Sequence, residues 1–413
     1  MRIRTTGVVA AFAMALALAG CGTSDEPAET STDAAGGKLV IWADDKRAEA
    51  LKPFAEKFGA ENGVTVEVQA VSKDLQTNFV TASQQGAGPD VVVGAHDWIG
   101  NMVQNGAIDP VQLTAEQKAG FNETAIAATS YNGQLYGVPY AMENLALIRN
   151  TELAPEAPKT IEDLVATGKK LKADGKVSEI LCLQVGDKGD AYHIYPFYTS
   201  GGGYLFGTGA DGGYDPSDLG VGKPESVEAF SKIAKLGEKG EGALKRSISD
   251  TNSISTFAGG KCAFLISGPW ATADAKKAEI SYDISNIPGF ADGEAARPFI
   301  GAQAFYVASK GANKALAQEF VTNYTTSTEV AVALYNAEAR PPALTAALDQ
   351  VKGADPDLAK FQAAGAEGDP LPAIPEMAAI WDPFGKAEAA IVGGADVKGA
   401  VDAAAKTIAD QIK

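Results

Sequence analysis

Tryptophans and acidic side chains near the ends of expected elements are the residues best suited to chemistry in this chain. Trp270 follows residues 267–269 (SGP) after an apolar run, which places it at the carboxyl end of a strand. Open α/β sheets bind ligands at that edge. Aromatic faces stack on sugar rings, and carboxylates accept hydrogen bonds from hydroxyls. The same inventory suits a polyamine through cation–π contacts, and core packing is the ordinary role of a single tryptophan.

Catalytic motifs are missing from the sequence. The two histidines, His96 and His193, have no metal-ligand spacing around them, so we expect structural hydrogen bonds from both. The chain has no Gly-x-Ser-x-Gly elbow and no phosphate-binding loop of the Gly-x-x-x-x-Gly-Lys type. A glycosidase pair of carboxylates stays open as an alternative. We therefore predict a protein that is not an enzyme and that needs neither a metal nor a cofactor.

The N-terminal sequence predicts a lipoprotein signal peptide. Arg2 and Arg4 precede a short apolar run, and residues 18–21 (LAGC) present Cys21 at a cleavage point, as in a bacterial lipobox. The alternative is an ordinary secretory signal that happens to contain a cysteine. Residues 22–37 are small and polar, which is typical of a flexible tether. We predict a signal peptide over 1–20, a diacylated (palmitate-bearing) Cys21, a tether over 21–37, and a protein lipid-anchored outside the cell membrane.

Composition limits the partners. The formal net charge is −17, with 52 acidic and 35 basic side chains, and such a surface repels nucleic acid and anionic lipid head groups. No later segment is long and apolar enough to span a bilayer, so the membrane is reached through the lipid alone. The chain is long enough for two domains, and we expect a monomer.

Cys182 and Cys262 are the remaining cysteines, and both lie in apolar, strand-like runs. Outside the cell the pair can form a disulfide if the two strands are neighbours, whereas strands further apart would leave two buried thiols.

The hydrophobic pattern predicts an α/β protein. Strands and helices alternate through the first part of the chain, with strands at 38–43, 64–70 and 91–93 and helices at 45–59, 73–85 and 99–106. Asn132-Gly133 predicts a hairpin. A second α/β set contains helices at 160–175, 224–236 and 315–324, strands at 179–185 and 263–266, and a helical C-terminal region from 357. Extended crossings near 140–148 and 298–306 join the two sets.

Several segments together resemble the maltose/maltodextrin-binding proteins, which are extracytoplasmic receptors of ABC sugar importers. The matching segments, in family order, are KLVIWADDK, GPDVVVGAHDWIG, YNGQLYGVPYAMENLALIRN, PKTIEDL, FAGGKCAFLISGPW, RPFIGAQAF and IPEMAAIW. The resemblance runs from Lys38 to the C-terminus. It implies the two-lobe periplasmic-binding-protein fold, with hinge crossings and a ligand cleft between the lobes. On it we expect an N-terminal lobe over 38–141 and 305–350 and a C-terminal lobe over 142–300 and 356–413.

The resemblance also implies a set of ligand-binding residues. Asp45 and Lys46 resemble a polar pair that binds sugar hydroxyls, and Asp97 a carboxylate that accepts from a hydroxyl. The others are an acid beside the hinge, an acid and aromatic of the second lobe, and two stacking aromatics: Glu143, Asp190, Tyr192, Trp270 and Trp381.

The chain departs from the family pattern in two places. A family aromatic is replaced by Gly94, while Trp98 stands where the family has a basic residue, as though the aromatic had moved; we include Trp98 in the site. Past Trp381, the aromatic position is Asp382 and the arginine position is Gly385. These changes argue against maltose itself as the preferred ligand of the α-glucan class, and they leave a longer maltodextrin, a cyclodextrin or trehalose.

The expected function is therefore capture of a maltose- or maltodextrin-type α-glucoside by lobe closure and delivery to the transmembrane subunits of an ABC permease. A polyamine or other cation receptor and a cell-surface glycosidase are the rival functions.

Overall fold

The computed structural model describes residues 37–209 and 213–412. The predicted signal peptide, Cys21 and all but the last residue of the tether lie outside this part of the chain. Among the residues described, no helix is both long and apolar enough to cross a membrane.

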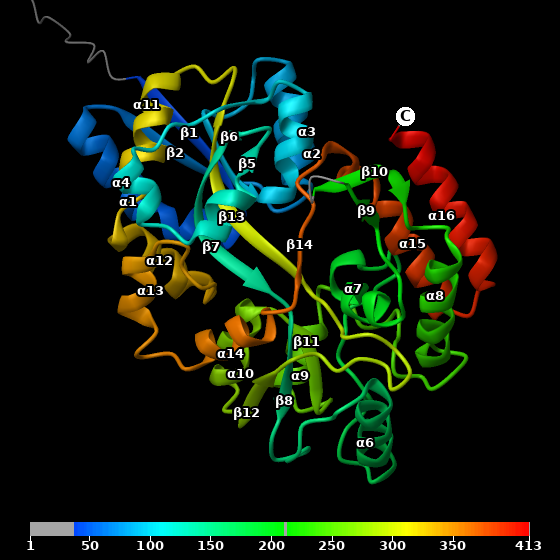
Figure 1. Cartoon of the computed structure of the whole chain (residues 1–413). Coiled ribbons are helices and arrows are strands. Elements are labelled where there is room, and N and C mark those ends of the chain that lie inside the picture. Colours follow the sequence, from blue (N-terminus) through cyan, green and yellow to red (C-terminus); the bar gives the residue numbers. More distant parts are fainter. Residues whose placement is uncertain (1–36, 210–212, 413) are drawn as a thin grey trace, which may run out of the picture. The chain divides into compact units, whose positions relative to one another are not determined.

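Strands and helices alternate over most of this length (Figure 1). The strands are β1 (Lys38–Ala43), β2 (Thr65–Ala70), β3 (Val91–Ala95), β4 (Ile108–Asp109), β5 (Ser130–Tyr131), β6 (Gln134–Leu135), β7 (Gly137–Asn144), β8 (Ala146–Asn150), β9 (Phe206–Thr208), β10 (Tyr214–Leu219), β11 (Phe264–Ser267), β12 (Tyr282–Ser285), β13 (Phe299–Ala308) and β14 (Asp369–Pro370). The α-helices are α1 (Asp45–Asn62), α2 (Leu75–Gln84), α3 (Ile99–Gln104), α4 (Ala115–Ala119), α5 (Glu123–Ala128), α6 (Ile161–Ala173), α7 (Ala191–Ser200), α8 (Pro224–Leu236), α9 (Ser253–Ala258), α10 (Thr272–Lys277), α11 (Lys314–Glu319), α12 (Thr328–Glu338), α13 (Thr345–Val351), α14 (Asp357–Ala364), α15 (Trp381–Val392) and α16 (Val397–Gln411). Short helical turns are η1 (His96–Trp98), η2 (Pro269–Ala271), η3 (Phe320–Tyr324) and η4 (Pro375–Ala379).

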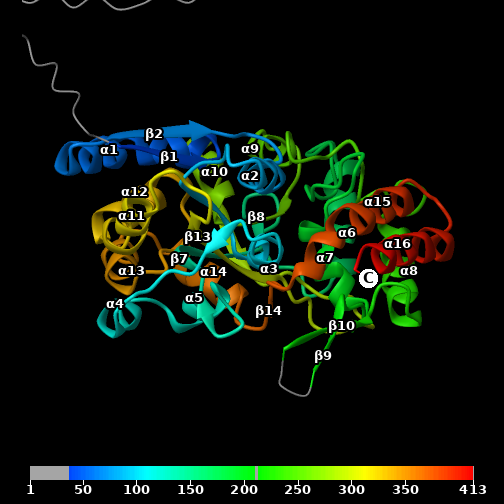
Figure 2. The ribbon, with the colours of Figure 1, turned by 90° about the horizontal axis from the view of Figure 1, so that it is seen from above.

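The largest sheet runs in the order β14-β13-β3-β1-β2, and β4 and β7 also pair with β13. Its centre is parallel, because β1 pairs in that sense with both β2 and β3, whereas β13 is antiparallel to β3 and β7. Helix α1 covers β1 and β2 (Figures 1 and 2). The three valines of β3, Val91, Val92 and Val93, are fully buried, as expected for a strand covered on both faces.

A smaller antiparallel sheet has the order β11-β8-β12. Only Leu145 separates β7 from β8, so one extended segment carries the chain from the large sheet to the small one. One hydrophobic core surrounds β1, β3, β7, β13, α1 and α12, and another lies among α6, α7, α8, α15 and α16. Helices α8, α15 and α16 lie side by side (Figures 1 and 2). The α/β class is thus observed, while the division into two lobes stays a prediction.

Local signals account for much of this. Helix α8 has the predicted bounds, and Thr160 caps α6 by accepting from the backbone N–H of Asp163 at 3.1 Å. Asn132 and Gly133 both have positive φ, 49° and 76°, as a two-residue hairpin turn between β5 and β6 requires.

The strand predicted at 179–185 is wrong. This segment lies beside β11, but only Cys182 forms a bridge, with Leu265. Val185 instead donates its backbone N–H to Ile248, away from the sheet, so the ladder cannot continue. An apolar run of this length predicts a strand equally well, but here it forms a buried segment with a single β-bridge.

Candidate ligand-binding site

Arg340 lies at the centre of a buried cluster of charged and aromatic side chains. It follows α12, where Ala339 adopts the left-handed conformation (φ 56°) and turns the chain out of the helix before Pro341. The guanidinium of Arg340 donates to the carboxylates of Glu143 and Glu338. Burial lowers the pKa of Arg340, but the two carboxylates outweigh this effect and raise it. The cation is therefore permanent.

Glu143, near the end of β7, connects this cation to β13. Its Oε2 accepts from Arg340, and its Oε1 accepts from Nε2 of Gln303 at 2.8 Å. Glu143 is 8% exposed. A side chain at Gly301, which faces Glu143 across the ladder, would come within 3.2 Å of it, so the glycine leaves room for the carboxylate.

Asp97 is held in η1, directly after β3. Burial raises the pKa of Asp97 to about 7, the negative charge of Glu143 acts in the same direction, and a hydrogen bond with Trp381 partly opposes the shift. Its neighbour His96 braces the turn, because its Nδ1 accepts from the N–H of Ala302 at 3.0 Å and its Nε2 donates to the carbonyl of Leu371 at 2.9 Å. His96 thus has the structural role expected for it.

The aromatic side chains close around these charges. The guanidinium carbon of Arg340 lies 4.9 Å from the centre of the Trp270 ring, a cation–π distance. Trp381 meets Phe299 edge-on at 6.2 Å, and Tyr192 stacks on the same phenylalanine at 6.0 Å. The Tyr192 hydroxyl is buried without a hydrogen-bond partner in the described part of the chain. Its pKa is raised well above the ordinary value, first by burial and next by the charge of Glu143.

The structure thus brings six predicted residues into one cluster, linked directly or, for Trp270, through Arg340 and His193: Asp97, Glu143, Asp190, Tyr192, Trp270 and Trp381. Carboxylates beside aromatic faces in a buried setting can orient a hydroxyl-bearing ring and stack against it.

Asp45 and Lys46 lie outside this cluster, exposed in the first turn of α1. The Asp45 carboxylate accepts from the Ser72 hydroxyl at 2.9 Å. Their turn is connected to the cluster through Arg47, which pairs with Glu338 at 3.1 Å, and Glu338 in turn pairs with Arg340.

Trp98 packs over Gly94. A Cβ at Gly94 would lie 1.9 Å from the Trp98 ring, so this ring occupies the space that a side chain at position 94 would fill. The departure noted in the sequence is therefore a coupled pair: glycine at 94 is required by tryptophan at 98.

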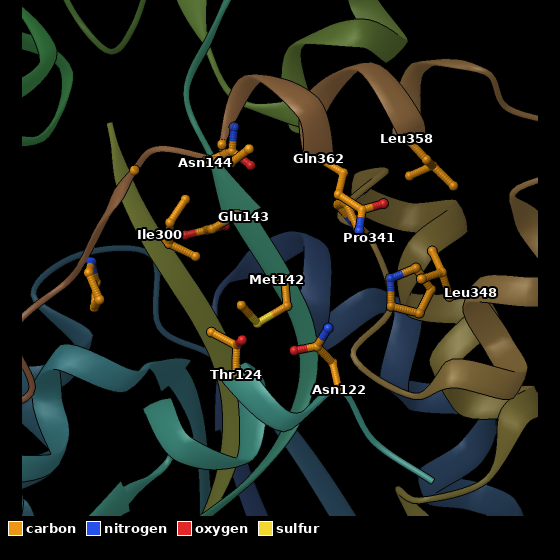
Figure 3. A pocket seen from close by; sticks show the side chains of 15 residues that line it. Asn122, Thr124, Met142, Glu143, Asn144, Ile300, Pro341, Leu348, Leu358 and Gln362 are labelled. Carbon is orange, nitrogen blue, oxygen red and sulfur yellow. The ribbon is translucent and has the colours of Figure 1, made fainter. Parts of the chain in front are cut away.

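A cavity of about 340 Å³ lies against the same strands (Figure 3). Met142, Asn144 and Ile300 contribute to its wall, together with α14 residues such as Leu358 and Gln362. Glu143 is the one predicted site residue among those lining it, so this cavity is distinct from the aromatic cluster.

Sequence reasoning did not find Arg340, Glu338 or Gln303. Arg340 had one local signal, an isolated arginine between the end of a helix and a Pro-Pro pair (ARPP). Because the residue before a proline is held extended, such a side chain has a restricted position. Gln303 lies inside the predicted extended crossing near 298–306 and has no signal of its own.

The family model for bacterial extracellular solute-binding proteins matches residues 53–364. The chain belongs to this family. It is 30% identical to the galactooligosaccharide-binding protein of Bacillus subtilis (strain 168), with 97% of this chain and 95% of that protein covered. It is 28% identical to a maltooligosaccharide ABC transporter solute-binding lipoprotein of Streptococcus pneumoniae (strain ATCC BAA-255 / R6), over 100% and 98% of the two chains. The maltodextrin-binding protein MdxE of Bacillus subtilis (strain 168) is 30% identical over 91% and 89%.

The raised pKa of Asp97 gives the stability of this solute-binding protein a testable pH dependence. A carboxyl whose pKa is raised on folding, here from 3.8 to about 7, stabilises the fold fully below the unfolded value and loses this contribution as pH rises through the folded value. Relative to the native protein, Asp97→Asn should therefore gain about 4 kcal/mol of unfolding free energy between about pH 4 and about pH 8. Urea denaturation across this range measures the difference; a difference that does not change with pH would contradict the raised pKa.

Proposed function

We propose that the chain is the lipid-anchored, extracytoplasmic receptor of an ABC importer and binds a maltose- or maltodextrin-type α-glucan oligosaccharide between two lobes. The main support is the cluster in which Trp270, Trp381 and Tyr192 surround the charged side chains of Asp97, Glu143 and Arg340. Aromatic faces with adjacent carboxylates match the alternating apolar faces and hydroxyl edges of a neutral sugar.

The proposed mechanism is a population shift. Residues of β7 belong to one hydrophobic core, whereas Leu145 and Leu147 belong to another, which is compatible with two lobes. The cluster takes Asp97 from the turn after β3 of the large sheet and Trp270 from the turn after β11 of the small one. A sugar that contacts residues of both lobes favours the closed conformation, in which these residues are close together. The closed receptor would then deliver the sugar to the permease. We further propose that Cys21 keeps the receptor beside its transporter, that it acts as a monomer, and that it carries out no chemistry itself.

The ligand class is best supported as an oligosaccharide, because the relatives above are named for maltooligosaccharide, maltodextrin or galactooligosaccharide binding. We favour the α-glucan. The Trp98–Gly94 exchange supports a preference other than maltose itself, among longer maltodextrins, cyclodextrin and trehalose.

A thermal-shift panel on the full chain tests this function. A ligand that binds only the folded state raises the melting temperature. Maltotriose, maltoheptaose, a cyclodextrin, trehalose and a galactooligosaccharide form one arm, and spermidine forms the other. A rise with an α-glucan is the expected result. A rise with the galactooligosaccharide alone would make a galactoside, not an α-glucan, the ligand. A rise with spermidine alone would indicate a polyamine receptor, and shortening of maltoheptaose would indicate a glycosidase.

Trp270→Ala should weaken binding of the α-glucan by about 1–3 kcal/mol, because the stacking area of the indole is lost. Calorimetry measures the affinity. Trp42→Ala is the matched control: Trp42 donates from its indole to Gln69 on β2, at 2.7 Å, and lies outside the cluster. Equal effects of the two substitutions would remove Trp270 from the binding site.

A further inference from the structure

Asp190 is already fully engaged with protein donors. Its Oδ1 accepts from the backbone N–H of His193 at 2.9 Å and from Nδ1 of the His193 ring at 3.1 Å, while its Oδ2 accepts from Gln184. The backbone N–H of Asp190 donates to Glu388 at 2.6 Å. The carboxylate therefore caps α7 and holds a histidine, a different task from the direct sugar contact expected for it.

The bond from His193 to Asp190 determines which ring nitrogen carries the proton. An ionised carboxylate only accepts hydrogen bonds, so the Nδ1 of His193 must be the donor. In the neutral imidazole, Nε2 is then an acceptor. His193 is 6% exposed, and its Nε2 is buried with no hydrogen-bond partner among the residues that the structure describes. A buried polar atom of this kind costs free energy unless something pairs with it.

The ring lies at the wall of the aromatic cluster. His193 meets the edge of Trp270 with the ring centres 6.4 Å apart and lies 5.5 Å from the ring of Tyr192. Two further unpartnered atoms belong to the same cluster, Oη of Tyr192 and Oε1 of Gln303. The amide nitrogen of Gln303 donates to Glu143, and its unpartnered atom, Oε1, is an acceptor like Nε2 of His193.

We propose that His193 is a specificity-determining residue of this site, whose Nε2 accepts a hydrogen bond from one hydroxyl of the sugar, and that Asp190 acts through it as a positioning residue. This inference rests on the proposed function. His193 Nε2 and Gln303 Oε1 both accept, and the Tyr192 hydroxyl can accept as well as donate, so these atoms favour a neutral ligand rich in hydroxyls. A sugar that lacks the paired hydroxyl would leave Nε2 unsatisfied and be rejected.

Two substitutions separate the roles of the two nitrogens. His193→Asn can keep a donor near Nδ1 for Asp190 but has no atom at the position of Nε2. His193→Gln places an amide near Nε2 instead. With the best oligosaccharide of the panel, calorimetry should show roughly tenfold weaker binding for His193→Asn and a change of about threefold or less for His193→Gln. A purely structural role would make both variants lose affinity together with melting temperature.

Deoxy sugars and NMR give readouts on correctly folded protein. The native protein should discriminate by roughly tenfold against one monodeoxy analogue, and His193→Asn should not. Because the chain has two histidines, the ¹⁵N resonances of His193 can be assigned by comparison with a variant in which His96 is replaced. We expect the Nδ1–H form, with the Nε2 resonance shifting when sugar binds. An Nε2–H form, or unchanged affinity in His193→Asn, would overturn this inference alone; native protein that binds no oligosaccharide would overturn the proposed function itself.

Discussion

Replacing Arg340 by alanine should lower the free energy of unfolding by about 3–5 kcal/mol, which is the usual cost of removing one partner of a buried ion pair. The guanidinium pairs with both Glu143 and Glu338; without it Glu143 would stay buried and lose its cationic partner, whereas Glu338 would keep Arg47. Its ring contact with Trp270 would be lost as well. Urea or guanidinium denaturation at neutral pH measures the change.

The matched control is Arg246→Ala. Arg246 donates to Glu238 at 2.8 Å in a comparably direct pair, but the arginine is 42% exposed. Exposed pairs contribute about 0–1 kcal/mol, so this variant should remain close to the native protein. If Arg340→Ala unfolds at the same denaturant concentration as the control, the buried network contributes little to stability and its role must lie elsewhere.

Local patterns were sufficient for most elements, because their determinants lie within a few residues. The Pro224 start of α8, the Thr160 cap and the Asn132-Gly133 turn each act on their own neighbourhood. The placement of Trp270 after a strand follows in the same way from the SGP sequence, which spans the junction of β11 and η2.

The electrostatic organisation of the site could not be predicted in this way, because its partners are far apart in sequence. Glu143 and Arg340 are separated by 197 residues, and no pattern around either one names the other. Residue type alone does not show which donors already occupy the carboxylate of Asp190. For His193, only three residues away, the sequence predicts a structural role, and only the fold shows that its Nε2 has no partner among the described residues.

Cys182 and Cys262 show the same dependence on tertiary contacts. Either a disulfide or two thiols fitted the sequence, and the choice depended on whether two strand-like runs were neighbours. The structure joins the cysteines in a disulfide, with their Cα atoms 6.1 Å apart. The contact follows from the single bridge between Cys182 and Leu265, which brings the irregular segment against β11.

Removing this disulfide should cost about 4 kcal/mol of stability. The bond closes a loop with a sequence separation of 80 residues, and the chain-entropy estimate for a loop of that length is about 4 kcal/mol, within the measured range of about 2–5. The test is Cys182→Ala/Cys262→Ala in guanidinium, compared with the native protein.

The native protein unfolded in the presence of a reductant is the internal control for this double variant. Because both cysteines are fully buried, the substitutions also remove packing atoms, so the reduced native protein isolates the contribution of the bond. Both should unfold at similar denaturant concentrations, well below the oxidised protein. Both should also show a steeper denaturant dependence, since an uncrosslinked unfolded chain exposes more surface. If reduction leaves the midpoint where it was, the bond does not constrain the unfolded chain and the stability of this region rests on its apolar core, including Phe257 and Leu265.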